Sequence, residues 1–256
     1  MNILALKLIL APVIIGGASL AGRKWGHTVS GWLIGLPLTS GPVAFFVALS
    51  HERSFLASTV LGTLSGGFAL VAFCLGYAWT AQRFKWPVAL AVSMLAFGSV
   101  TLLMQNVILP LGPLFGLVLL TILAGMALMP RSQPLTATDA RPGRWDIPGR
   151  ILLGTSFILL LTGSAPFIGA RLTGLLSTIP LYTAILTVFA QRQQSRAGAV
   201  DILRGLLLGM FGFSAFYLTL ALLLDRTGIV PAFLAAVVIT LIVQGASFFV
   251  LRKSQS

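Results

Sequence analysis

The hydroxyl side chains with the best case for ligand binding lie in two similar stretches, residues 35–42 (GLPLTSGP) and 174–180 (GLLSTIP). Each stretch contains an adjacent pair of hydroxyl residues, Thr39 and Ser40 in the first and Ser177 and Thr178 in the second. Both stretches lie in apolar runs, where proline kinks or opens a helix and the freed carbonyl needs a protein or water partner. Interrupted spans at matching positions of two halves point to a transporter's binding site. We therefore expect the four hydroxyl residues to contact a substrate.

These hydroxyl groups also have a structural interpretation. Serine and threonine in a helix donate to the carbonyl of the preceding turn, and they bond one membrane helix to another. The prolines on both sides of the first pair, and the presence of a matched second pair, favour a binding site.

Two glutamines, Gln105 and Gln244, are also predicted to be substrate-binding residues. They are 139 positions apart, at equivalent places in two similar segments, and both belong to long apolar runs. An amide in lipid needs a partner, so each should face the interior of a helix bundle. The alternative is a hydrogen bond between helices, worth about 0.6–2 kcal/mol. Asn106 and Tyr182 are secondary candidates for the same interior.

The acidic residues are few, and none falls in the middle of an apolar run. They lie at the ends of runs or in a polar segment: Glu52, Asp201, Asp225, Asp139 and Asp146. A carboxylate inside a membrane usually marks a proton or cation relay, so carboxylate-based coupling is not expected. His27 and His51 fall at opposite interfaces and Cys74 is the only cysteine. We therefore expect no metal, no cofactor and no enzymatic activity.

The composition is that of a membrane protein. Of the 256 residues, 57% are hydrophobic and only 9% are charged, whereas soluble domains carry about 25% charged residues. The formal net charge of +12 would indicate nucleic-acid binding in a soluble protein. Here it is typical of the basic cytoplasmic loops that fix membrane topology, so no nucleic-acid partner is expected.

The apolar runs predict an all-α bundle of about nine spans, since a span needs about 20 apolar residues. The predicted spans are 3–22, 28–50, 54–79, 87–108, 109–129, 151–169, 172–190, 202–224 and 229–251. Residues 109–113 (LPLGP) divide the fourth span from the fifth, and residues 130–150 form a polar linker. If the chain crosses the membrane nine times, most of its Lys and Arg residues lie on the same side of the membrane. The positive-inside rule then places the protein in the cell membrane (the inner membrane if bacterial), with the N-terminus outside and the C-terminus cytoplasmic.

The chain contains a weak internal repeat. The stretches 35–42 and 174–180 begin 139 positions apart, residues 61–73 match 204–216 at an offset of 143, and residues 100–105 match 239–244 at 139. The predicted units are therefore 1–108 and 151–256, each of four spans, joined by a connecting span and linker at 109–150. Five spans separate equivalent helices, and an odd number reverses direction. The two units should form an inverted repeat, a common transporter design.

Residues 170–180 (ARLTGLLSTIP), followed by a polar turn and residues 202–211 (ILRGLLLGMF), resemble the GlpM-like family of small bacterial membrane proteins. The resemblance covers the sixth to eighth spans and, more faintly, the first to third. It implies a bacterial membrane protein whose two halves descend from a unit that paired head to tail. No established activity of that family can be carried over.

Together these features predict a secondary transporter or lipid translocase. Its substrate would be uncharged, zwitterionic or lipid-like, and Arg53 and Arg171 would steer an anionic group. The alternative is a non-transporting membrane subunit in envelope biogenesis. Its glycine faces would pack against a membrane-protein partner or a second copy: Gly62, Gly66, Gly205 and Gly209. In either case the surrounding partner is membrane lipid.

Overall fold

The computed structural model describes residues 6–13, 35–130, 146–193 and 196–253, and every regular element in these ranges is a helix. A short helix covers residues 6–13. The labelled helices are α3 (Ser40–Ser50), α4 (Arg53–Thr80), α5 (Trp86–Gln105), α6 (Leu111–Leu128), α7 (Asp146–Ile168), α8 (Ala170–Leu176), α9 (Leu181–Gln193), α10 (Arg196–Thr227) and α11 (Ile229–Lys253). The prediction of an all-α chain is confirmed for the described residues.

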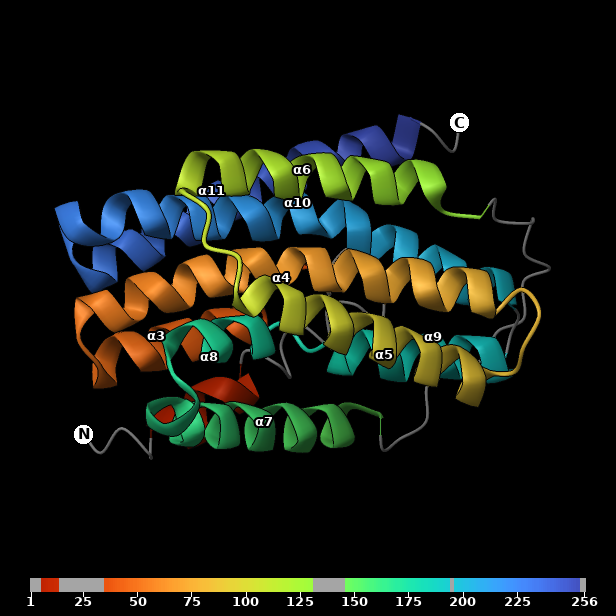
Figure 1. Ribbon diagram of the computed structural model, residues 1–256, viewed down its shortest axis with the longest axis horizontal. Helices are drawn as coiled ribbons and strands as arrows, with labels where there is room; N and C mark the ends of the chain where they lie inside the picture. Colours follow the sequence, from red (N-terminus) through yellow and green to blue (C-terminus); the bar gives the residue numbers. More distant parts are fainter. Residues whose placement is uncertain (1–5, 14–34, 131–145, 194–195, 254–256) are drawn as a thin grey trace.

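Two long helices, α4 and α10, form the centre of the molecule (Figure 1). They pack against each other, and each also contacts α6; α4 additionally contacts α3, α5 and α8, and α10 contacts α9 and α11. Helix α7 lies on the far side of α3 and α8 and contacts both. In both central helices more than half of the most apolar stretch is buried.

Seven segments are long and apolar enough to cross a membrane: 53–80, 86–105, 111–128, 151–168, 170–192, 196–227 and 229–247. They coincide with the third to ninth predicted spans, and the predicted division near Pro110 separates α5 from α6. Helix α7 begins at Asp146, inside the predicted linker, and Pro148 is compatible with this because proline is tolerated in a first turn. Nearly all of the first predicted span, the second up to residue 34 and most of the linker lie outside the described residues.

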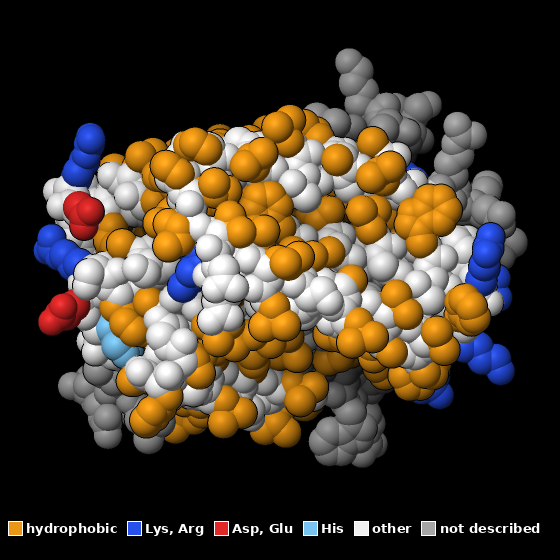
Figure 2. All heavy atoms as spheres, viewed as in Figure 1, with side chains coloured by type: hydrophobic (Ala, Val, Ile, Leu, Met, Phe, Trp, Pro, Cys, Tyr) orange, Lys and Arg blue, Asp and Glu red, His pale blue; other side chains and the backbone are white. Residues whose placement is uncertain are grey.

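The outer helices present apolar side chains to their surroundings. Leu95 on α5, Leu120 on α6, Leu160 on α7 and Leu241 on α11 are 58–73% exposed. Figure 2 shows hydrophobic side chains over the middle of the visible face, with Lys and Arg gathered at its two ends. An apolar surface of this extent is unusual for a soluble monomer, and it is what helices facing lipid require. The chain is a multi-pass membrane protein.

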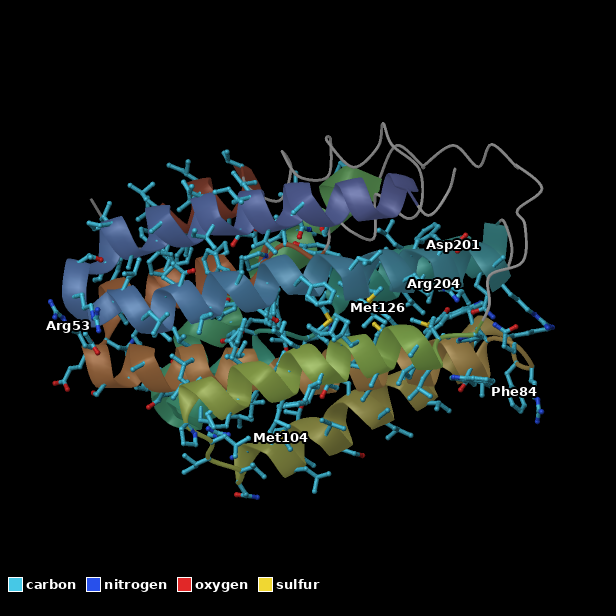
Figure 3. The ribbon with its side chains drawn as sticks, turned by 90° about the horizontal axis from the view of Figure 1, so that it is seen from above. Arg53, Phe84, Met104, Met126, Asp201 and Arg204 are labelled. Carbon is cyan, nitrogen blue, oxygen red and sulfur yellow. The ribbon has the colours of Figure 1, made fainter. Side chains whose placement is uncertain are left out.

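The two ends of the molecule are marked by Arg53 and Phe84, and we call them the Arg53 end and the Phe84 end (Figure 3). Helix α3 runs toward the Arg53 end, and α4 runs from there to the Phe84 end (Figure 1). Helices α5 and α10 start at the Phe84 end, whereas α11 runs toward it. The long helices therefore lie roughly along the long axis of the molecule.

Candidate functional site

The second proline-containing stretch interrupts a helical span, as predicted, and the first directly precedes a helix; we call both non-helical stretches breaks. Residues 35–39 form turns, and α3 begins only at Ser40. In the second stretch α8 ends at Leu176, residues 177–180 are non-helical, and α9 begins at Leu181. The interrupted span 170–192 is therefore two half-helices joined by a short break.

The two breaks meet at one cavity of about 40 Å³, which we call the break cavity. Residues 35–40 and 177–183 supply most of its wall, and the side chains of Leu70, Leu206, Met210 and Phe213 complete it. All four predicted hydroxyl residues line it: Thr39, Ser40, Ser177 and Thr178. A space of this size holds a single small group such as one water molecule. The structure thus brings together two stretches that are 139 positions apart in the sequence.

Glycine contacts hold each break against a central helix. A Cβ atom at Gly35 would overlap the backbone of Gly209 on α10, and one at Gly174 would lie 2.7 Å from the backbone nitrogen of Thr63 on α4. Thr178 lies directly over Gly66 on the same helix. The first break therefore packs on α10 and the second on α4, because only glycine lets the backbones approach this closely.

The hydroxyl groups of the second break serve the backbone. Ser177 donates to the carbonyl of Gly174 at 2.6 Å, and Thr178 donates to the carbonyl of Leu175 at 2.7 Å. These bonds satisfy carbonyls that the interrupted helix leaves without an amide partner four residues on. Ser177 also lies 3.2 Å from the hydroxyl of Thr63, which donates to the carbonyl of Thr59 at 2.9 Å. At this break the structural interpretation of the hydroxyls therefore holds alongside their exposure to the cavity.

Two polar residues next to the cavity are missing from the sequence-based prediction, Thr63 and Tyr217. Both have no exposed surface. The Tyr217 hydroxyl interacts with the hydroxyls of Ser40 and Thr63, although neither contact has the geometry of a hydrogen bond. A tyrosine inside an apolar run was the available signal, because a buried tyrosine hydroxyl normally finds a partner.

The two predicted glutamines lie away from the break cavity. Gln105 is the last residue of α5 and is half-buried. Gln244 is buried on α11, where its side-chain oxygen faces Gly212 of α10 and Thr240 lies one turn away. Gln244 thus belongs to the α10–α11 contact. Of the secondary candidates, Tyr182 lines the cavity and Asn106 is exposed.

The electrostatic character of the break cavity comes from helix ends, because none of its lining residues is charged. Helices α3 and α9 both begin at the cavity and run toward opposite ends of the molecule (Figure 1). The amino end of a helix carries a partial positive charge of about half an elementary charge. The carboxyl end of α8, which carries the opposite partial charge, also lies at this small space, so positive and negative helix ends meet there.

Arg171, at the start of α8, is engaged elsewhere. Its guanidinium donates to the carbonyl of Met104 at 2.8 Å and also to that of Val107. These carbonyls lie at the carboxyl end of α5, where a cation is favourable because of the helix dipole. Arg171 therefore caps α5 and ties it to α8.

A broad, shallow depression of about 750 Å³ opens at the Arg53 end. Its wall includes Ser54 and Ser58 of α4 and Ala170 of α8. Between this depression and the break cavity, Gly62 of α4 packs on the backbone of Arg171. The close contact of α4 with α8 therefore separates the two spaces.

Among the described residues, no three His, Cys, Asp or Glu side chains come together as metal ligands would. The break cavity accordingly offers hydroxyl groups and backbone amides rather than metal ligands or catalytic acids and bases. A comparison with known proteins gave no match: no protein-family model, no curated protein and no solved structure matches the chain. The resemblance of residues 170–211 to the GlpM-like family therefore stays a prediction.

Proposed function

We propose that this protein is a secondary transporter or lipid translocase of the cell membrane, and that its substrate passes through the break cavity. One observation carries the proposal. Two non-helical stretches from distant parts of the chain place four hydroxyl residues around one cavity, inside a bundle whose outer helices expose apolar side chains. Irregular backbone at membrane depth is tolerated where protein buries it or where it lines a water-filled path. The substrate is an uncharged, zwitterionic or lipid-like molecule.

The predicted inverted repeat supports this function. Helices α4 and α10, matched at an offset of 143, run in opposite directions, and so do α5 and α11, matched at 139 (Figure 1). The breaks follow the same relation, since α3 runs toward the Arg53 end whereas α8 and α9 run away from it. Each break also packs on the central helix of the other unit. Transporters built from inverted repeats bind substrate where the units meet and rock one unit against the other.

Helix α8 has the features of the element that opens the Arg53 side. It has only seven residues, from Ala170 to Leu176, and lies between the second break and Gly169. Gly169 has a φ of +83°, which glycine adopts without strain. Helix α8 approaches α4 closely at Gly62 and Gly174. A short helix with a hinge at each end can move away from α4 and connect the break cavity to the depression at Ser58.

The orientation follows from the basic residues. At the Phe84 end lie Arg83, Lys85, Arg192, Arg196 and Arg204, and their contacts include Arg196 with the carbonyl of Gln82 at 2.5 Å and Arg204 with that of Pro130 at 2.8 Å. Cytoplasmic loops are enriched in Lys and Arg. The Phe84 end is therefore cytoplasmic in this proposal, and the depression at the Arg53 end opens to the outside.

The test is cysteine accessibility across the membrane. Cys74→Ala removes the single native cysteine, which is buried, and single cysteines then replace Ser40 or Thr178. A membrane-impermeant thiol reagent is applied to each face in turn. Both positions should react from at least one face, because a transport cycle exposes the break cavity to water.

Three further single cysteines control this experiment. Ser54→Cys and Phe84→Cys, at opposite ends, should react from opposite faces, and Ser93→Cys, fully buried on α5, should not react. If the two ends react normally while positions 40 and 178 stay unlabelled from both faces, the transport proposal is wrong and a packing subunit is favoured. If Ser54→Cys and Phe84→Cys react from the same face, the inverted arrangement itself is wrong.

A further inference from the structure

Lys7 is a basic residue that packs among apolar helices rather than in a loop. It belongs to the short helix at residues 6–13, drawn in red in Figure 1, which lies between α3 and α7. Its ammonium group donates to the hydroxyl of Thr162 on α7 at 2.8 Å and lies 5.6 Å from the centre of the Phe46 ring on α3. A charged side chain within a membrane span is costly and usually functional, so this lysine needs an explanation.

The contacts of Lys7 place its ammonium group near one surface of the membrane. Helices α3 and α7 both run toward the Arg53 end (Figure 1). Phe46 lies about one turn before the last residue of α3, and Thr162 lies less than two turns before the last residue of α7. A lysine at this depth can direct its ammonium group toward the lipid headgroups while its methylene chain stays among apolar groups.

No carboxylate balances this charge among the described residues, because none of their Asp and Glu side chains forms an ion pair with Lys7. An ammonium group has three N–H donors, and the hydrogen bond to Thr162 uses one of them. The Thr162 hydroxyl donates its own proton to the carbonyl of Ile158 at 2.7 Å, so it serves Lys7 only as an acceptor. Two donors and the full positive charge remain available to a ligand.

Membrane topology does not account for Lys7 either. The positive-inside rule enriches Lys and Arg in cytoplasmic loops, and the basic residues at the Phe84 end follow it. Lys7 lies in a helix toward the opposite end, next to residues of two other helices.

The surface around Lys7 is apolar and exposed. On its own helix Leu8 and Val13 are 50% and 64% exposed, and on α7 Leu160 and Phe167 are 73% and 89% exposed. These side chains belong to the surface that faces lipid. The unpaired ammonium group therefore lies beside a surface suited to acyl chains, and the anion that a bilayer presents at such a place is the phosphate of a lipid headgroup.

We propose that Lys7 binds the phosphate of a phospholipid in the leaflet at the Arg53 end, and that the acyl chains lie along the exposed apolar side chains of the short helix and α7. Thr162 is a positioning residue, because it orients the ammonium group by accepting from it. The proposal goes beyond transport, since Lys7 is not among the residues that line the break cavity.

The experiment measures thermal unfolding of the purified protein in detergent at constant ionic strength. Dioleoyl phosphatidylglycerol and dioleoyl phosphatidylethanolamine should each raise the unfolding midpoint, because a ligand that binds only the folded state stabilises it. Dioleoylglycerol has the same chains without a phosphate, and sodium phosphate has no chains, so neither should raise it comparably. If either of these two raises the midpoint as much as the phospholipids do, the proposal of a phospholipid site is overturned.

Variants connect the effect to Lys7. Lys7→Met removes the charge from a side chain of similar length and should lose most of the phospholipid-dependent shift, as should Lys7→Gln, which keeps a donor for Thr162. Lys7→Arg retains a cation and should retain the shift. Lys85→Met is the matched control, because it removes an exposed lysine at the Phe84 end, and it should respond as the wild type does.

Two results with these variants would overturn the proposal. In the first, Lys7→Met and Lys7→Gln lower the midpoint equally with and without phospholipid, which would mean that Lys7 only ties the short helix to α7. In the second, Lys85→Met loses as much of the shift as Lys7→Met does, which would mean that the shift reflects net charge.

The cysteine labelling of positions 40 and 178 separates this inference from the proposed function. Phospholipid-dependent stabilisation that requires Lys7, with both positions unlabelled, retains the lipid site and counts against transport. Labelling of both positions without such stabilisation retains transport and overturns the lipid site.

Discussion

Tyr77 and Tyr217 are both fully buried on central helices, yet their hydroxyl groups make different contacts. The Tyr77 hydroxyl donates to the side-chain oxygen of Gln191 at 2.8 Å, and the Gln191 amide in turn donates to the carbonyl of Phe84 at 3.0 Å. This chain of bonds fixes the loop at the Phe84 end to α9. The Tyr217 hydroxyl makes no such bond in the described residues. One tyrosine therefore stabilises the fold through a chain of hydrogen bonds, and the other packs its hydroxyl against those of Ser40 and Thr63.

This difference predicts opposite effects of the same substitution. Tyr77→Phe removes a hydrogen bond and leaves the Gln191 oxygen without that donor, so it should lower the free energy of unfolding by about 1 kcal/mol. Tyr217→Phe removes an unsatisfied buried hydroxyl without changing the ring, so this variant should be at least as stable as the wild type. Thermal unfolding in detergent measures both. A clear loss of stability in Tyr217→Phe would show that its hydroxyl has a structural partner.

At the scale of elements, the contact between α8 and α4 depends on the absence of side chains. Gly62 of α4 packs on the backbone of Arg171, and Gly174 of α8 packs on the backbone between Thr59 and Thr63. Glycine in a helix interior costs about 1 kcal/mol relative to alanine. Here the close approach that it permits brings Ser177 within 3.2 Å of Thr63 and positions the second break.

Gly174→Ala tests this contact. The added methyl group would overlap the carbonyl of Thr59, a backbone atom that cannot move aside cheaply, so the variant should lose at least about 2 kcal/mol of stability. Gly98→Ala on α5 is the matched control, because nothing lies within 4 Å of its added methyl group, and its stability should be equal or higher. Thermal unfolding in detergent compares the two. If the Gly174→Ala and Gly98→Ala variants unfold at the same temperature, the close contact of α8 with α4 is contradicted.

For the whole molecule, the exposed leucines on α5, α6, α7 and α11 define a surface that must meet lipid or another protein. Spin labels placed one at a time at Leu95, Leu120, Leu160 and Leu241 distinguish contact with lipid from contact with another protein. In proteoliposomes each label should collide more often with oxygen, which concentrates in lipid, than with a water-soluble nickel complex. A label at Ser54, at the Arg53 end, should show the reverse.

The outcome also bears on partners. If one of the four outer helices is shielded from both reagents while the other three meet lipid, that helix is the interface with a second copy or another membrane protein. Preferential collision of all four leucine labels with the nickel complex would contradict the membrane assignment.

The contacts that the glycines make within the chain bear on the alternative function, a non-transporting subunit that packs against a membrane-protein partner. Gly62 and Gly66 contact α8 and Thr178, and Gly209 contacts Gly35, so these small-residue faces are occupied within the chain. A subunit that binds a partner would have to use the outer leucine-rich helices instead.

The sequence by itself determined the features that depend on local chemistry. About 20 apolar residues make a span whatever their neighbours are, so the described spans and the division near Pro110 follow from composition. Proline kinks or breaks a helix when it stands in its interior, so the two stretches rich in proline and glycine could be located in advance as candidate breaks, although Pro166 lies within α7 without ending it. Their hydroxyl pairs could be identified for the same reason.

Only the tertiary structure decided which side chains meet. A helix that is apolar all round gives no sign of which face turns inward. The sequence therefore could not tell that Gln244 packs on Gly212, nor that Tyr217 reaches Ser40, 177 positions away. These contacts depend on the rotation of each helix about its axis and on how closely glycines let the backbones approach. The sequence thus located the breaks, and helix packing brought them together at one cavity.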